Sequence, residues 1–247
     1  MTLNLVLISV GFILFASFLF LPLSSLEATS GDSIIFPPNS TPYGVPYSEW
    51  LGLWWKYWLG IPNNEHPAID YNSDKCSIHQ EGPVWFLPDV ITKGDAPYTR
   101  VEFSCVIPKE KAILFPISTG SCWLGIPEFK HIQDKLSPRP DVDAELKRCA
   151  VGPQDNTEIF YVRVDGTDIK NGLARVTTSF YNVTTPKQPV TDIYSGIESG
   201  TSRAIANGYF VFLRPLSQGE HIIEFSVEDL IQGQKYAREG KYTISTR

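Results

Sequence analysis

The chain has 247 residues, with 21 Lys and Arg against 27 Asp and Glu, and a formal net charge of −6. Charged residues make up 19% and aromatic residues 13%, which excludes a disordered chain and a coiled coil. The acidic balance argues against nucleic acid as a partner, because binding phosphates needs a basic surface.

The first element in chain order is an apolar segment, LNLVLISVGFILFASFLFLP at residues 3–22, with no charged side chain before Glu27. Such a segment is typical of a secretory signal, and its length is also close to that of a membrane-spanning helix. We predict that residues 1–28 are either a signal peptide, cleaved near Ala28, or an N-terminal membrane anchor. Under both alternatives the rest of the chain is extracytoplasmic, either secreted or held at the membrane by residues 3–22.

Residues 29–46 are rich in Pro, Ser and Gly, which predicts a linker to a single domain at 47–247. The domain opens with YSEWLGLWWKYWLGIP, whose apolar residues fill one wide arc of a helical wheel. One interpretation is that Trp50, Trp54 and Trp58 stack on a sugar ligand or lie at a membrane interface. The favoured interpretation is a helix that covers an open face of a β-sandwich, with its indoles in the core.

After this helix the apolar pattern changes to period two, which is typical of half-buried strands. We predict strands at Pro83–Leu87, Arg100–Ile107, Lys111–Ile117, Thr157–Asp165, Leu173–Asn182, Asn207–Leu213, Glu220–Val227 and Lys241–Thr246. Half-polar strands without alternating helices indicate antiparallel pairing. The predicted fold is mainly β: an antiparallel β-sandwich, jelly-roll or immunoglobulin-like, with one Trp-rich helix and a small helical insertion at 127–150.

Four cysteines follow the export segment: Cys76, Cys105, Cys122 and Cys149. An even number in an oxidising compartment predicts two disulfides, and three connectivities are open. We favour Cys76–Cys105 and Cys122–Cys149, because each closes a local excursion of the chain. The rival interpretation is a four-cysteine metal site, which the absence of any C-x-x-C pair disfavours.

A polar segment beside the first cysteine can be compared with a calcium-binding loop. Asp70, Asn72, Asp74 and Glu81 fall at positions 1, 3, 5 and 12 of that pattern, whose oxygen ligands wrap Ca²⁺. Against it, Lys75 stands where the pattern needs glycine for a sharp turn. Calcium is therefore the one candidate cofactor, and the alternative is a polar loop that carries a disulfide.

Two sequons, at Asn39 and Asn182, are candidate glycosylation sites. No G-x-S-x-G, G-x-G-x-x-G, P-loop or HExxH pattern is present in the sequence. His221 opens a strand and is best interpreted as a structural histidine, whereas His79 lies where a metal site could form. A glycosidase needs two carboxylates across a cleft, and the sequence does not indicate which acids would pair.

The domain also carries several longer motifs: E-W-x-x-x-W-W-x-Y-W at Glu49–Trp58, C-x-x-x-Q-x-G-P-V-W-F-L at Cys76–Leu87, C-V-I-P-x-x-K-A-I-L-F-P-I at Cys105–Ile117, A-E-L-K-R-C-A at Ala144–Ala150, and A-N-G-Y-F-V-F-L-R-P-L followed by G-E-H-I-I-E-F within Ala206–Phe225. Together they resemble a family of exported prokaryotic proteins of unassigned function. The resemblance implies one exported domain with two disulfides, and it implies no activity.

These observations predict an exported or surface-anchored, non-enzymatic β-sandwich that binds a glycan, another surface protein or an envelope component. One alternative is an extracytoplasmic glycan-acting hydrolase. The other is a structural subunit of a membrane or envelope assembly, held by an uncleaved N-terminal helix.

Overall fold

The structure, a computed structural model, describes residues 33–92, 96–231 and 233–247. Ile34–Arg247 form one compact unit. The apolar segment at 3–22 lies outside the described residues, and so does the choice between cleavage and anchoring. Among the residues that are described, no helix is long and apolar enough to cross a membrane.

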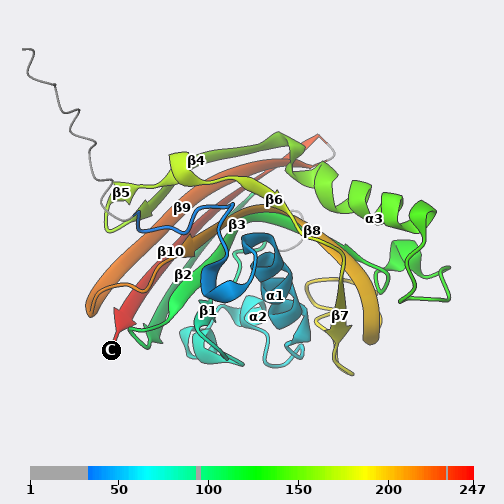
Figure 1. The fold of residues 1–247 in the computed structure, drawn as a ribbon, viewed down its shortest axis with the longest axis horizontal. Coiled ribbons are helices and arrows are strands. Elements are labelled where there is room, and N and C mark those ends of the chain that lie inside the picture. Colours follow the sequence, from blue (N-terminus) through cyan, green and yellow to red (C-terminus); the bar gives the residue numbers. More distant parts are fainter. Residues whose placement is uncertain (1–32, 93–95, 232) are drawn as a thin grey trace, which may run out of the picture. The chain divides into compact units, whose positions relative to one another are not determined.

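Two five-stranded sheets carry the fold (Figure 1). Sheet A has the strand order β1-β3-β8-β6, with β7 also paired to β8, and sheet B has the order β2-β10-β9-β4-β5. The bounds are β1 Val84–Phe86, β2 Tyr98–Ile107, β3 Ala112–Trp123, β4 Thr157–Val164, β5 Thr167–Asp168, β6 Arg175–Thr177, β7 Tyr181–Thr185, β8 Gly200–Leu213, β9 Gly219–Ile231 and β10 Gln234–Thr246.

The prediction of a mainly β protein is confirmed, and each predicted strand range overlaps a strand. The range Leu173–Asn182, predicted as one strand, instead covers β6 and the first two residues of β7. The prediction of purely antiparallel sheets is wrong in part, because β1 runs parallel to β3 and β2 runs parallel to β10. Both sheets are therefore mixed and the arrangement is sandwich-like, while neither a jelly-roll nor an immunoglobulin topology is confirmed. The physical reason is that a period-two pattern reports which face of a strand is buried, and it does not report which strand lies beside it.

Sheet A is buried on both faces, which explains the unbroken apolar run of β3. Ile113 and Phe115 belong to the core between the two sheets, whereas Ala112 and Leu114 belong to a second core on the opposite face. β8 alternates in the same way along its C-terminal half. Sheet B, in contrast, buries one face only, and the burial of β2, β9 and β10 alternates residue by residue.

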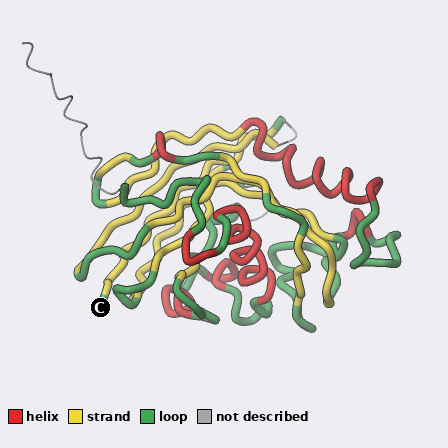
Figure 2. The backbone as a smooth tube through the Cα atoms, in the orientation of Figure 1, coloured by secondary structure: helices red, strands yellow, loops and turns green. Residues whose placement is uncertain are grey.

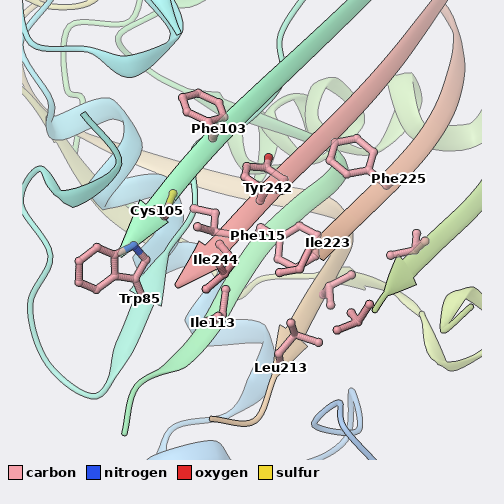
Figure 3. Close-up of a cluster of buried hydrophobic side chains, with 14 of the residues drawn as sticks. Trp85, Phe103, Cys105, Ile113, Phe115, Leu213, Ile223, Phe225, Tyr242 and Ile244 are labelled. Atoms are coloured by element: carbon pink, nitrogen blue, oxygen red, sulfur yellow. The ribbon is translucent and has the colours of Figure 1, made fainter. Parts of the chain in front are cut away.

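Aromatic rings dominate the core between the sheets (Figure 3). Phe103 and Tyr242 stack with their ring centroids 5.8 Å apart, and Phe115 and Phe225 approach to 6.5 Å. The Tyr242 hydroxyl donates to the Pro88 carbonyl oxygen at 2.7 Å, so the polar atom of this buried ring is hydrogen-bonded.

Helix α1, Tyr47–Gly60, covers the other face of sheet A (Figures 1 and 2). Trp50, Trp54 and Trp58 recur every fourth residue and so share the helix face that meets the sheet. The rings of Trp54 and Trp58 stack at 5.2 Å, and Trp54 meets Phe210 of β8 edge to face. The helix thus covers the sheet with its indoles in the core, as the favoured interpretation of the sequence predicts.

Helix α3, Pro140–Val151, lies where the sequence predicts a helical insertion, and it packs on β3 and β8. Val142, Leu146 and Ala150 form a third, smaller core with these strands. Short helical segments complete the domain: α2 Pro67–Asp70 and the 3-10 turns η1 Pro42–Gly44, η2 Ser73–Ser77, η3 Pro127–Phe129, η4 Gly152–Asn156 and η5 Lys170–Gly172.

Both favoured disulfides are present, Cys76–Cys105 and Cys122–Cys149. The first joins η2 to β2 and the second joins β3 to α3. All four cysteines of the sequence are therefore paired, and no free thiol remains.

The described part of the predicted linker, from residue 33 to 46, lies against sheet A. Ile35 forms a β-bridge with Leu213, and the Phe36 N–H donates to the Phe212 carbonyl oxygen at 2.8 Å. The Phe36 and Phe212 rings also meet edge to face at 4.9 Å. These residues are therefore part of the folded body.

Candidate functional site

The three tryptophans considered as ligand-stacking residues are buried. Trp50, Trp54 and Trp58 are 6%, 0% and 0% exposed. Each indole N–H donates inside the protein, to the carbonyl oxygens of Pro42 and Leu87 and to the Tyr194 hydroxyl. The aromatic motif therefore builds the core, and its ring faces are not presented to an external sugar or membrane. A helical wheel shows an apolar arc, and it cannot show whether a sheet or a ligand covers that arc.

A groove of about 580 Å³ lies on the opposite, exposed side of α1, between this helix and β7. One wall is formed by Glu49, Leu53 and Lys56, which are spaced along one side of α1. The other wall is the consecutive run Thr178–Asn182, made of the three residues that connect β6 to β7 and the first two residues of β7. We call this feature the α1–β7 groove, and the two elements that form it lie side by side in Figure 1.

Close packing at Gly52 sets the floor of the α1–β7 groove. A Cβ atom at Gly52 would lie 3.3 Å from the Tyr181 ring, so glycine allows the ring to approach the helix. The Tyr181 hydroxyl lies 3.0 Å from the Ser121 hydroxyl, and burial raises the pKa of this phenol. The Lys56 ammonium stands 5.9 Å from the Tyr181 ring centroid, within cation–π range. The groove therefore combines an aromatic floor with one cation and one anion on its helical wall.

The four candidate calcium ligands make other contacts. Asp70 forms an ion pair with Lys75 at 3.0 Å, and the Asn72 side-chain oxygen accepts from the Asp74 N–H at 3.0 Å. In the described part of the chain, no group of three or more His, Cys, Asp and Glu side chains is placed to hold a metal ion. Calcium binding by this loop, with Glu81 as the last ligand, stays a prediction that these contacts do not support.

Both sequon asparagines are exposed to solvent. Asn39 lies in a turn before η1, and Asn182 lies on β7, where it also lines the α1–β7 groove. Their modification stays a prediction. A sugar on Asn182 would stand beside the groove.

Two further candidates from the sequence make local contacts. The His221 Nδ1 lies 2.7 Å from the Asp165 carboxylate and its Nε2 lies 2.9 Å from the Ser217 carbonyl oxygen, so the ring is held in a structural position. His79 pairs with Glu65 at 3.3 Å, and both side chains are about half exposed.

A cluster of charged groups that sequence reasoning did not find is buried near the β9–β10 hairpin. Arg238 forms an ion pair with Asp229 and donates to the carbonyl oxygens of Val90, at 3.0 Å, and Ile117, at 3.3 Å. Asp89 lies 3.7 Å from the guanidinium, and among the described residues its Oδ1 has no hydrogen-bond donor. Asp89, Asp229 and Arg238 are 4%, 5% and 7% exposed. The cluster is closed to solvent, so we interpret it as a structural network.

The alternation of inward and outward residues along β9 and β10 could have revealed this cluster from the sequence. Asp229 continues the buried face of Ile223, Phe225 and Val227 in β9, at the next inward position. Arg238 likewise precedes Tyr242 on the inward face of β10. The strands predicted from sequence end at Val227 and begin at Lys241, so both charged residues lie outside them.

We expect the stability of the protein to depend on pH through Asp89. Burial raises the pKa of Asp89 to about 7, against the opposing effect of Arg238. The unfolded chain releases this proton near pH 4, so the folded state holds more protons between these values and loses stability as the pH rises. Asp89→Asn should therefore be the more stable protein at pH 8, by up to about 4 kcal/mol.

Urea denaturation at pH 5 and pH 8 measures this effect, with the exposed Asp74→Asn as the matched control. The increase in the free energy of unfolding that Asp89→Asn produces should be clearly smaller at pH 5 than at pH 8. A gain of equal size at both pH values would contradict the assignment to Asp89.

A second pH effect of opposite sign is expected from His66, which is fully buried. Burial lowers the pKa of His66 to about 4. Its Nε2 lies 3.1 Å from the Trp58 carbonyl oxygen and its Nδ1 accepts from the Ala68 N–H, which fits a neutral ring. Below pH 6.5 the unfolded chain binds this proton and the folded chain does not, so stability falls by up to about 3 kcal/mol towards pH 4.

An NMR titration of the imidazole resonances checks the His66 prediction. The His66 signal should stay unshifted from pH 8 to pH 5, because burial lowers the pKa of this ring to about 4. A His66 midpoint above pH 6 would contradict it.

No family model, curated protein or solved structure matches the chain. The resemblance of its motifs to exported prokaryotic proteins therefore stays a prediction.

Proposed function

We propose that the chain is an extracytoplasmic, non-enzymatic binding protein whose ligand occupies the α1–β7 groove. The groove itself carries the proposal, because it is an open hollow with polar and aromatic lining, built from a helix, the β6–β7 connection and the start of an edge strand. The two disulfides fit an oxidising, extracytoplasmic compartment.

The composition of the groove disfavours the hydrolase alternative. Glu49 is the one carboxylate among the described residues that line it. Glycoside hydrolysis uses a pair of carboxylates on either side of the scissile bond. Binding without turnover therefore fits this lining better than catalysis does.

The test uses the full chain on a glycan array and on a phage library of random nonapeptides, with turnover assays on the same glycans. We expect saturable binding of at least one ligand without turnover. Leu53→Arg should abolish that binding, because Leu53 is on the helical wall of the groove. The matched control is Val106→Arg, which introduces the same side chain at a 51% exposed position on the outer face of sheet B.

Three outcomes would contradict the proposal: turnover of a glycan, an equal loss of binding affinity in Leu53→Arg and Val106→Arg, or no ligand from either panel. Turnover would favour the hydrolase. Recovery of the full chain in a stoichiometric membrane assembly, with neither panel giving a ligand, would favour the structural subunit. Melting curves of both variants confirm that each is folded before binding is compared.

A further inference from the structure

β7 lies at an edge of sheet A. Within the described part of the chain it pairs with β8 alone, so one of its two sides has no strand partner. The exposed backbone of an edge strand is a template for pairing with another chain. Proteins commonly protect such edges with Lys or Pro. The five residues of β7, Tyr-Asn-Val-Thr-Thr, contain neither, and Pro186 and Lys187 follow directly after the strand ends.

The hydrogen bonds of Arg203 in β8 establish which residues of β8 face β7. The Arg203 N–H donates to the Lys135 carbonyl oxygen at 2.8 Å, and its own carbonyl oxygen accepts from the Leu124 N–H at 3.0 Å. The Arg203 backbone therefore points away from β7. Since neighbouring residues of a strand direct their backbone groups to opposite sides, the residues on either side of Arg203 point towards β7.

The register then identifies the free groups of β7. Ser202 pairs with Val183 and Ala204 pairs with Tyr181, so Val183 and Tyr181 bond to β8. Asn182 and Thr184 alternate with them, and they direct their backbone N–H and C=O outward. Asn182 is also a lining residue of the α1–β7 groove, so these outward groups begin at the groove and continue along β7.

The wall of the groove that faces α1 is the start of β7 together with the connection that leads into it. Thr178–Phe180 of the β6–β7 connection line it, and so do Tyr181 and Asn182 of β7, so the groove continues along the chain into the edge strand. The facing helical wall places Leu53 between Glu49 and Lys56.

We propose that the ligand of the α1–β7 groove is an extended peptide segment that adds as a strand to the free edge of β7. Its backbone would bond to the outward groups of Asn182 and Thr184. An apolar side chain would face Leu53, and an acidic side chain would lie near Lys56. This mode, in which main-chain hydrogen bonds bind and alternate side chains select, is known for edge strands. The inference rests on the binding function proposed above and names its ligand class.

The backbone pattern favours a peptide over a sugar. Outward donor and acceptor groups recur at every second residue of β7, which matches the period of an added strand. One cation and one anion on the helical wall suit a peptide with charges of opposite sign at either end of the bound stretch.

The experiment selects a binder from random nonapeptides displayed on phage, using the full chain made in a host without N-glycosylation. The selected peptide is then synthesised with one backbone N-methyl group at each position in turn. We expect affinity to fall about tenfold at alternate residues, because each N-methyl removes one donor. At the residues between them, the affinity should change less than twofold.

Hydrogen exchange supplies a readout on the protein. The amides of Asn182 and Thr184 should exchange fast in the free protein and slow at least tenfold when the peptide binds, while Val183 should stay slow in both states. Lys56→Glu should lose preference for the peptide's acidic residue and regain affinity when that residue is replaced by Lys.

Failures of the two proposals are distinguishable. A glycan that binds the groove while no peptide is selected would overturn the peptide inference and leave the binding function standing. A selected peptide whose affinity is insensitive to N-methylation, or that leaves the Asn182 and Thr184 amides exchanging fast, would also overturn it. Absence of any ligand from both panels would overturn both.

Discussion

Replacing Arg238 by Met should lower the free energy of unfolding by about 3–5 kcal/mol at neutral pH. Arg238 is the one cation of a buried network with two carboxylates, Asp229 and Asp89, among the described residues. Without it, Asp229 keeps its hydrogen bonds from the Ser118 and Thr157 hydroxyls, at 2.7 and 2.6 Å, but has no countercharge. Removing one partner of a buried pair leaves an uncompensated charge in a low-dielectric interior.

Urea denaturation of wild type and Arg238→Met at pH 7 measures this loss. Arg100→Met is the matched control, because Arg100 lies on the outer face of the same sheet and pairs with the exposed Glu102 at 2.9 Å. Its unfolding midpoint should stay close to that of the wild type.

A triple variant tests the cause. Adding Asp229→Asn and Asp89→Asn to Arg238→Met removes the unpaired charge of Asp229 and any charge left on Asp89, whose pKa burial already raises to about 7, and should recover much of the stability. If Arg238→Met alone is as stable as Arg100→Met, the network does not have the structural role assigned to it.

The second large effect concerns the disulfides. Cys76–Cys105 and Cys122–Cys149 span 29 and 27 residues of sequence. In the chain-entropy model a loop of this size contributes about 3–4 kcal/mol, because the cross-link restricts the unfolded chain. Removing both disulfides should therefore lower the free energy of unfolding by an amount comparable with the whole stability of an ordinary domain.

Melting curves with and without reductant, together with the double variants Cys76→Ser/Cys105→Ser and Cys122→Ser/Cys149→Ser, measure these contributions. Each double variant should melt below the wild type, and full reduction should lower the melting temperature most. An unchanged melting temperature in reductant, with free thiols confirmed by mass, would contradict the prediction.

Loss of each disulfide should also destabilise a different part of the domain. Cys149 holds α3 to β3, and α3 otherwise rests on the smallest of the three cores. Without that bond, hydrogen exchange should rise in α3 first, while the strands of sheet B stay protected. Uniform exchange across the domain would indicate that α3 and the sheets unfold as one unit.

Much of the fold follows from local patterns that can be read without a structure. Helix α1 follows from apolar residues at helical spacing, and its indoles lie in the core as the favoured interpretation requires. The strands follow from alternation, as in β9, where Ile223, Phe225 and Val227 share the buried face. The disulfide pairing follows because each favoured pair closes a short excursion.

The candidate site was much less predictable. The sequence drew attention to Trp50, Trp54 and Trp58, which are buried, and to the segment from Asp70 to Glu81, where Asp70 instead pairs with Lys75. Residues such as Leu53 and Lys56 gave no signal, since one apolar and one basic residue on a helix are common. They become a site only because β7 lies beside them.

Local sequence thus determined helix α1, most of the strands and the mainly β class, because each depends on residues near one another or on a short repeat. It also favoured, among three open connectivities, the disulfide pairing that the structure contains. Tertiary structure alone decided the parallel pairings, the Arg238 network and the α1–β7 groove. The physical reason is that alternation records whether a side chain faces the core, while the strand order decides which neighbour it meets there. Arg238 and Asp229 lie on paired strands, and β3 of the other sheet contacts both of them through Ile117 and Ser118. The edge of β7 is free because, among the described residues, β8 is its one strand partner in sheet A.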